Sequence, residues 1–444
     1  MFTSEPSLAQ RIERLIADTP IVDTHSRIDP GQPGVPDLAA LIGDAWVGNG
    51  LLASGLPPAD LDPTLPADER VRRSIPYLKR MRNTAAAWCL FRIFRDLYDF
   101  DEPHLTLENY RALFDRVEAG GRDPAWAGSV LGARSRLRAI VTDQGPASSK
   151  ASEGPGIFAH RLEAGPLLCP GLAGGRTTPA ASWAGGNAVE RLEATLGERP
   201  TSPGHLERLV FDWLDRTVTD RVRFVSTPLG LNQRFEFPPE SQFSHVIERA
   251  MGQLTSSSAD LPPSPHDLER LASFVLWPVL MWHHERKKSL QLVVGAGSPP
   301  PSWSGPALPG STWRVDMARS FRMAHGAKID LIVADGGLAR EAASLAGELP
   351  NVHVSGDWGG NFFPKAIEEG LMQRIQLAPM SKLTGFVSNA ASVEWSYGRL
   401  QMARKAMALA LAGLVEGRYF EEDEVSPLLA QILDETPRQL YGLD

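Results

Sequence analysis

The sequence has little cysteine, no long apolar run and no excess of basic residues. Its two cysteines, Cys89 and Cys169, have no companion at CxxC or CxxxC spacing, which argues against a structural zinc site. No window approaches the roughly 20 uncharged apolar residues of a membrane-spanning helix. The 444 residues carry a formal net charge of -8, whereas nucleic-acid binding needs a concentrated basic face. We therefore expect reduced thiols, a cytoplasmic location, and no nucleic-acid or membrane partner.

Motifs for several common chemistries are also absent from the sequence. No glycine-rich turn follows Val22, and no GxxxxGK[ST] occurs, so neither a dinucleotide fold nor a phosphate-binding P-loop is indicated. The sequence contains neither HExxH nor GxSxG, the motifs of zinc proteases and of serine hydrolases. The order of the predicted strands and helices is therefore the next guide to the fold and to the position of a functional site.

Short β-rich runs alternate with helical stretches along most of the chain. The strand-like runs are 21–25, 137–142, 157–162, 222–226, 290–294, 329–334, 352–355 and 383–387. Helical patterns cover 205–215, 266–286, 338–347, 365–373 and 392–414. Strand-then-helix order requires a parallel sheet, and about eight strands over this length favour a closed (β/α)8 barrel. We predict one barrel over residues 1–444, with a helical insertion after the first strand over residues 36–126.

In a parallel barrel, the reactive face lies at the carboxyl ends of the strands. Polar residues lie at the ends of the predicted strands or just after them. Asp23, His25 and Arg27 belong to the first strand and its following loop, and Asn389 follows the last strand. Asp143, Asp335 and Asp357 each follow one of the strands in the middle of the chain. These positions are the first candidates for a functional site.

Several of these segments resemble the amidohydrolase superfamily, in its uronate isomerase-like branch. Asp23-Thr24-His25-Ser26-Arg27 is similar to the HxH signature on the first strand of that family. Residues 140–146, 291–297, 350–354 and 382–398, the last with its VEWSYG, continue the likeness in the family's order. The resemblance implies a (β/α)8 barrel of the metal-dependent hydrolase type.

The resemblance also implies a divalent metal such as zinc, and the sequence departs from the expected ligands. His25 matches the first histidine, but Arg27 stands in place of the second. Val293 and Asn389 stand where a histidine and an aspartate are expected, and no histidine occurs in IDLIVADGG. Valine has no lone pair, and arginine stays protonated in proteins. We therefore expect no bound metal.

Three functional hypotheses follow from these replacements. We favour a non-catalytic protein, a pseudoenzyme, that binds a small carboxylated or sugar-acid ligand or serves as an accessory subunit. The second hypothesis is a metal-free enzyme that acts on such a ligand. The third is an active hydrolase or uronate isomerase, as the resemblance alone implies. The expected partner is a small molecule, and assembly into a homo-oligomer is left open.

The candidate residues divide into two groups, and each residue also has a purely structural interpretation. The candidate catalytic residues are His25, Arg27, Asp143 and Asp335. The candidate substrate-binding residues are Arg234, Asp357, Trp358, Asn389 and Tyr397. A strand-end histidine is often a hydrogen-bonded core residue, Arg27 or Arg234 can serve an ion pair, and Asp143 can cap a loop. Aromatic packing is the alternative for Trp358 and Tyr397.

Overall fold

A computed structural model describes residues 5–143, 156–164, 188–229, 244–255, 265–295, 313–334, 336–357 and 363–443. The chain divides into two compact units, which we describe separately. Unit 1 comprises Met1–Phe158, Gly360–Glu369 and Phe386–Asp434. Unit 2 comprises Ala159–Gly359, Gly370–Gly385 and Glu435–Asp444. In the described residues, no helix is long and apolar enough to cross a membrane.

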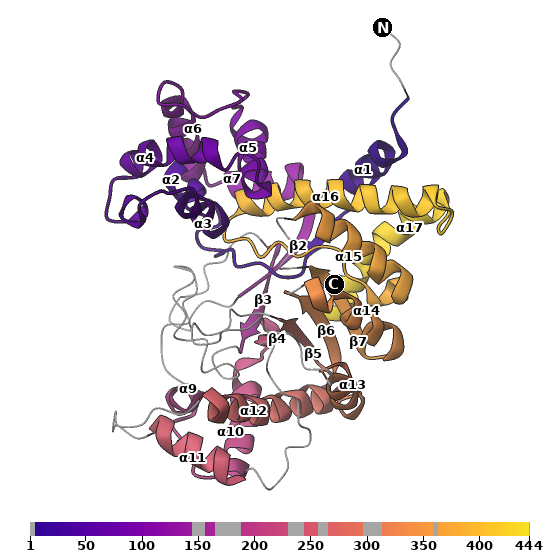
Figure 1. Ribbon diagram of the computed structural model, residues 1–444. Helices are drawn as coiled ribbons and strands as arrows, with labels where there is room; N and C mark the ends of the chain where they lie inside the picture. Colours follow the sequence, from indigo (N-terminus) through magenta and orange to yellow (C-terminus); the bar gives the residue numbers. More distant parts are fainter. Residues whose placement is uncertain are drawn as a thin grey trace. The chain divides into compact units, whose positions relative to one another are not determined.

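The described strands number seven, and their order follows the chain, β1-β2-β3-β4-β5-β6-β7 (Figure 1). They are β1 (Ile21–Asp23), β2 (Leu137–Asp143), β3 (Phe158–Glu163), β4 (Val222–Leu229), β5 (Ser289–Val294), β6 (Lys328–Val333) and β7 (Val352–Asp357). In unit 1, β1 pairs with β2 in parallel. In unit 2, β3 through β7 pair in parallel, each with the next. The predicted parallel α/β sheet is confirmed.

The predicted strand over residues 383–387 does not form. Leu383 makes only an isolated bridge to Val354, and Thr384 N donates to Val354 O at 3.1 Å. The backbone beyond this point has no regular pairing, because Gly385 interrupts the apolar run and the following groups bond to loop residues. Seven strands among the described residues therefore replace the eight that the sequence predicts.

Unit 1 contains β1, β2 and a set of helices. The helices are α1 (Leu8–Asp18), α2 (Leu38–Ile42), α3 (Ala45–Ala53), α4 (Ala67–Arg80), α5 (Ala85–Tyr98), α6 (Tyr110–Arg122), α7 (Trp126–Gly128), α16 (Val393–Glu416) and α17 (Val425–Ala430). The described residues between β1 and β2 form helices and turns only. The long helix α16 packs against α1 and α5 (Figure 1). Gly398 permits this close approach, because a Cβ there would lie 2.8 Å from Ile93 Cδ1.

A buried carboxylate ties α16 to the residues between β1 and β2. Glu394, which is fully buried, accepts hydrogen bonds from Trp126 Nε1 at 2.8 Å, Tyr98 Oη at 3.2 Å and Val35 N at 3.2 Å. All three donors are neutral, and burial raises the pKa of Glu394. These hydrogen bonds fix the start of α16 against Val35, which precedes α2, and against Trp126, which begins α7.

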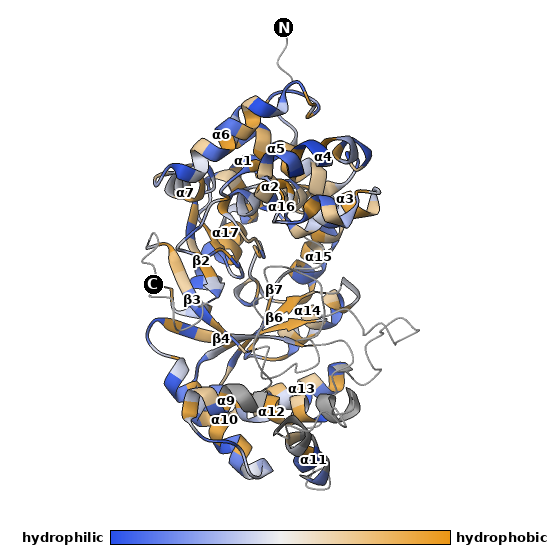
Figure 2. Ribbon diagram, turned by 90° about the vertical axis from the view of Figure 1, so that its left-hand side faces the viewer, coloured by the Kyte–Doolittle hydropathy of each residue, from blue (hydrophilic) through white to orange (hydrophobic). Residues whose placement is uncertain are grey.

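Unit 2 surrounds its five strands with helices. They are α9 (Ala188–Leu196), α10 (Pro203–Thr217), α11 (Ser244–Thr255), α12 (Pro265–Arg286), α13 (Trp313–Met323), α14 (Ala339–Glu348), α15 (Pro364–Leu377) and α18 (Thr436–Tyr441); the first residues of α15 belong to unit 1. Strands β5 and β6 are almost continuously buried and mostly apolar, which is typical of parallel strands covered on both faces. Figure 2 shows the apolar character of β6.

Polar side chains interrupt these apolar strands at neighbouring positions. Ser226, Gln291 and Asp330 follow one another across β4, β5 and β6. Ser226 Oγ donates to Gln291 Oε1 at 3.0 Å, and Gln291 Nε2 donates to Tyr441 Oη at 2.7 Å. The Tyr441 hydroxyl donates in turn to Asp330, which also accepts from Ser355 Oγ at 2.6 Å. The side chain of Tyr441 on α18 therefore completes a buried polar network in unit 2.

Candidate functional site

The residues after β1 lie between the end of β2 and the segment 386–390. On one side, Ser26 N donates to Val141 O at 2.8 Å, and Thr142 Oγ1 donates to Ile28 O at 2.6 Å. On the other side, Thr24 N donates to Phe386 O at 3.1 Å. These bonds fix the backbone of residues 24–28 at the carboxyl end of β1.

Asn389 lies at the centre of this arrangement. Its backbone φ of 47° is in the left-handed region, which asparagine tolerates better than most residues. Asn389 N donates to His25 O at 2.7 Å. The residue is 5% exposed, and its side-chain Oδ1 is buried with no hydrogen-bond partner among the described residues. An isolated buried acceptor is costly unless a ligand satisfies it, so this oxygen is suited to receive a hydroxyl.

Arg27 and His25 flank Asn389. Arg27 N donates to Ala390 O at 2.8 Å, and Arg27 Nη2 donates to Asn389 O at 3.4 Å. His25 is 2% exposed, and its backbone N–H donates to Asp23 Oδ1 at 3.4 Å. The predicted residues His25, Arg27 and Asn389 therefore come together in unit 1.

Asp23 and Arg399 hold the same turn; Asp23 was one of the strand-end candidates from the sequence, whereas Arg399 was not among our predicted site residues. Ser388 N donates to Asp23 Oδ1 at 2.9 Å, and Arg399 Nη1 donates to Ser388 O at 2.5 Å. Asp23 was visible as a strand-end carboxylate. The sequence did contain a signal for Arg399, because it is a charged residue in a largely apolar helix. A charge that is buried in such a helix needs a polar partner.

The remaining predicted residues have different outcomes. Asp143 ends β2 and is half-buried. Tyr397 is buried, and its hydroxyl donates to Asp96 Oδ2 on α5 at 2.7 Å. Asp357 ends β7 in unit 2. Arg234, Asp335 and Trp358 lie outside the described residues. The functional roles of all these residues stay predictions.

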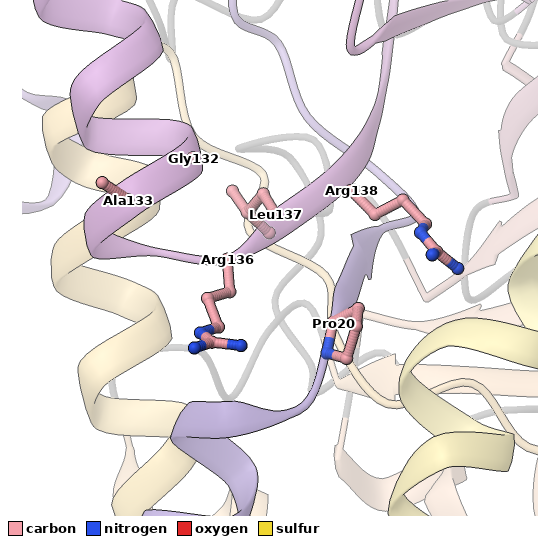
Figure 3. A pocket seen from close by; sticks show the side chains of 6 residues that line it. All are labelled: Pro20, Gly132, Ala133, Arg136, Leu137 and Arg138. Carbon is pink, nitrogen blue, oxygen red and sulfur yellow. The ribbon is translucent and has the colours of Figure 1, made fainter.

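A surface hollow of about 450 Å³ lies at the opposite ends of β1 and β2 (Figure 3). Pro20 and Arg136 line it, directly before β1 and β2 begin, together with Arg138. Arg136 Nη1 donates to Asp18 O at 3.1 Å, and Arg138 pairs with Asp434 at 2.7 Å. Both arginines thus bind groups near the amino ends of β1 and β2. In parallel barrels, this face contributes to stability, and the active site lies at the opposite face.

The donor set at the turn does not fit the divalent metal that the resemblance implies. Among the ten histidines, only His25 follows the carboxyl end of a described strand. Within the described ranges, no three His, Cys, Asp or Glu side chains converge. Asn389 offers a neutral side-chain oxygen, and the Arg27 guanidinium, a fixed positive charge, donates to the backbone O of the same residue. We therefore derive no step through a metal.

The chain is similar to uronate isomerases over its whole length. The uronate isomerase of Xanthomonas euvesicatoria pv. vesicatoria is 24% identical over 477 residues, covering 98% of this chain and 96% of the relative. The crystal structure of uronate isomerase from Thermotoga maritima has a TM-score of 0.76 at 16% identity, covering 99% and 100% of the two chains. That of glucuronate isomerase from Caulobacter crescentus has a TM-score of 0.77 at 18% identity, covering 100% and 96%. No protein-family model matches the chain.

These similarities contradict our expectation of a non-catalytic ligand-binding protein, since the relatives are enzymes. The expectation treated the replaced metal ligands as a lost site. His25, Arg27 and Asn389 nevertheless meet at the carboxyl end of β1, where Asn389 N donates to His25 O and Arg27 Nη2 donates to Asn389 O. A guanidinium can bind a sugar acid, and an imidazole can exchange protons. The chain therefore has the fold of the uronate isomerases, with their sequence likeness from end to end.

Proposed function

We propose that this protein is an isomerase of a uronate, converting an aldose acid into the corresponding ketose acid. The observation that carries the proposal is that hydrogen bonds join His25 and Arg27 to the backbone of Asn389, whose buried Oδ1 has no hydrogen-bond partner among the described residues. The similarity to enzymes named uronate isomerase along the whole chain supports the same reaction.

Each of the three groups has a role that suits this substrate class. A guanidinium binds a carboxylate through two parallel hydrogen bonds, so Arg27 would hold the acid group of the sugar. The Asn389 Oδ1 acceptor would receive a sugar hydroxyl and thereby regain a hydrogen bond. Both contacts would hold the substrate at the turn where Asn389 N bonds to His25 O.

The reaction moves one proton between neighbouring carbons and a second proton between the oxygens that these carbons carry. A base removes the proton from the carbon beside the carbonyl while the carbonyl oxygen gains a proton, which gives an enediol. The neighbouring hydroxyl then loses its proton and becomes the new carbonyl, and the former carbonyl carbon gains a proton. Imidazole is the commonest general base in enzymes, and His25 is the histidine at this place. Asp143, at the end of β2, is the neighbouring carboxylate proposed to share the proton exchange.

The experiment is to incubate the protein with glucuronate in D2O and follow the sugar by NMR. We expect the ketose signals to grow, with solvent deuterium on the former carbonyl carbon in place of the proton that the neighbouring carbon lost. Glucose, which lacks the carboxylate, should react far more slowly. A folded protein that neither forms ketose nor exchanges this proton, with glucuronate or galacturonate, would overturn the proposal.

Arg27→Met tests the carboxylate contact directly. Loss of a charge-assisted pair with the substrate should raise KM by about 100-fold. Arg122→Met is the control, because Arg122 is an exposed arginine that pairs only with Glu118 on its own helix among the contacts described for it. An unchanged KM for Arg27→Met would remove Arg27 from substrate binding.

We also infer a closed (β/α)8 barrel over the whole chain, with residues 36–126 inserted after the first strand. The fold shared with the solved uronate isomerases supports this inference. The segment 383–390 would take the eighth position.

A further inference from the structure

Arg399 is a buried charge outside the proposed substrate-binding groups. It lies on α16, is 2% exposed, and donates from Nη1 to Ser388 O at 2.5 Å. Side chains on a helix lean toward its N-terminus, which lets this long side chain reach back to the residues before α16. Arg399 therefore acts on the turn that carries Asn389.

Asp44 is the counter-charge of Arg399. The distance between Arg399 Nη2 and Asp44 Oδ1 is 3.6 Å, and the two side chains are 2% and 5% exposed. Asp44 also caps α3, because its Oδ1 accepts from Trp46 N at 3.2 Å. Burial lowers the pKa of Arg399, and Asp44 opposes this shift. Since a buried charge is tolerated only with a well-placed partner, Asp44 holds Arg399 in place.

The turn itself is held from two sides. Asp23 accepts from Ser388 N on one side, and Arg399 donates to Ser388 O on the other. The next residue, Asn389, has the left-handed backbone conformation, which persists only where the surroundings enforce it. The two contacts of Ser388 supply that enforcement.

We propose that Arg399, held by Asp44, is a positioning residue that fixes the Ser388–Asn389 turn, and thereby the position of the Asn389 acceptor. This inference rests on the proposed function for its effect on the reaction. Its structural part, the fixing of the turn, is measurable without any substrate.

The structural experiment compares hydrogen exchange in peptides that cover residues 386–392. Arg399→Lys keeps the charge but loses the planar fork, and Asp44→Asn keeps a capping side chain but removes the counter-charge. We expect exchange at these amides to become roughly tenfold faster in either variant, while the middle of α16 stays protected. If Arg399→Lys does not fold, Asp44→Asn carries the test.

The kinetic experiment uses the same variants with glucuronate. A displaced Asn389 should lower kcat by about 10- to 100-fold while KM changes less than about threefold, because the Arg27 contact to the carboxylate remains. Arg404→Lys is the matched control. Arg404 is a buried arginine on the same helix, and its Nη2 donates to Ser135 O at 2.7 Å, at the start of β2. It should lose stability without faster exchange at residues 386–392 and without the fall in kcat.

Two outcomes would overturn the inference. One is unchanged exchange at residues 386–392 in both variants, and the other is faster exchange with unchanged kcat. If the unaltered protein does not isomerise a uronate, the proposed function fails, and the exchange measurement alone decides whether Arg399 fixes the turn.

Discussion

Trp126 Nε1 donates a hydrogen bond of 2.8 Å to Glu394 Oε1, across 268 positions of the chain. The same carboxylate accepts from Tyr98 and from the backbone of Val35. One side chain at the start of α16 thus gathers three segments of unit 1.

Glu394→Ala should therefore lower the stability of the protein strongly. Two buried donors, from Tyr98 and Val35, and the part-buried Trp126 donor lose their acceptor, and unsatisfied groups are costly, so we expect a loss of about 3 kcal/mol in the free energy of unfolding. Urea denaturation followed by tryptophan fluorescence measures it. Glu416→Ala, at the exposed end of the same helix, should change the free energy by less than about 0.5 kcal/mol. Similar losses in both variants would show that Glu394 has no special structural role.

Asn389→Gly separates the backbone of the turn from its side chain. Glycine adopts the left-handed conformation freely, so the fold should be kept. The lost Oδ1 should reduce kcat/KM for glucuronate by about 100-fold, as expected for a missing substrate contact. Asp99→Gly is the control, since Asp99 has a φ of 51° at the end of α5. Equal activity in the two variants would assign Asn389 a backbone role only.

Tyr441→Phe tests the polar network of unit 2. Asp330 would lose one donor and Gln291 Nε2 would lose its acceptor, in a fully buried place. We expect a loss of about 2 kcal/mol in stability, visible as a lower melting temperature. Tyr419→Phe should leave the melting temperature unchanged, because Tyr419 is 78% exposed. A melting temperature of Tyr441→Phe equal to that of the unaltered protein would argue against the network's contribution.

Acid should destabilise the protein in part through His283. Burial lowers its pKa to about 4, while Nδ1 bonds to Val279 O at 2.7 Å. The unfolded chain therefore binds a proton at this residue more readily, so its contribution to stability is present above about pH 6.5 and is lost as the pH falls toward 4. The loss from this one group amounts to about 3 kcal/mol.

His283→Met should flatten the pH dependence of the unfolding free energy between pH 6.5 and 4. His104→Met, at an exposed position, should leave that slope as it is. Chemical denaturation at a series of pH values checks both. A slope that His283→Met does not change would place the acid sensitivity elsewhere.

The strands were predictable because their residues are apolar and β-branched, and because they alternate with helices. The seven runs from 21–25 to 352–355 correspond to β1 through β7. The run at 383–387 looked the same in composition, yet its backbone groups bond to Val354 at one end and to Thr24 at the other. Composition alone does not tell which neighbour a backbone group will find.

The candidate site was predictable in part, because functional residues of parallel barrels lie at the carboxyl ends of the strands. His25, Arg27 and Asn389 meet because two chain segments reach the same edge. The supports behind them were not predictable, since Arg399 and Glu394 are ordinary charged residues in a helical pattern. Their partners Asp44 and Trp126 are hundreds of positions away in the sequence, so the residues next to Arg399 and Glu394 do not indicate which partner each one has. The expected cytoplasmic location and the open question of a homo-oligomer stay predictions.

The division of the chain into two interleaved units has a consequence for its synthesis. Residues 1–158 contain β1 and β2, but the segment 386–390 and helix α16 that pack on them emerge from the ribosome only after residues 159–359 of unit 2. The residues around Asn389 therefore cannot acquire their native partners while translation of the middle of the gene is under way. Until then the apolar faces of α1 and α5 remain uncovered, which makes the growing polypeptide a natural client for molecular chaperones.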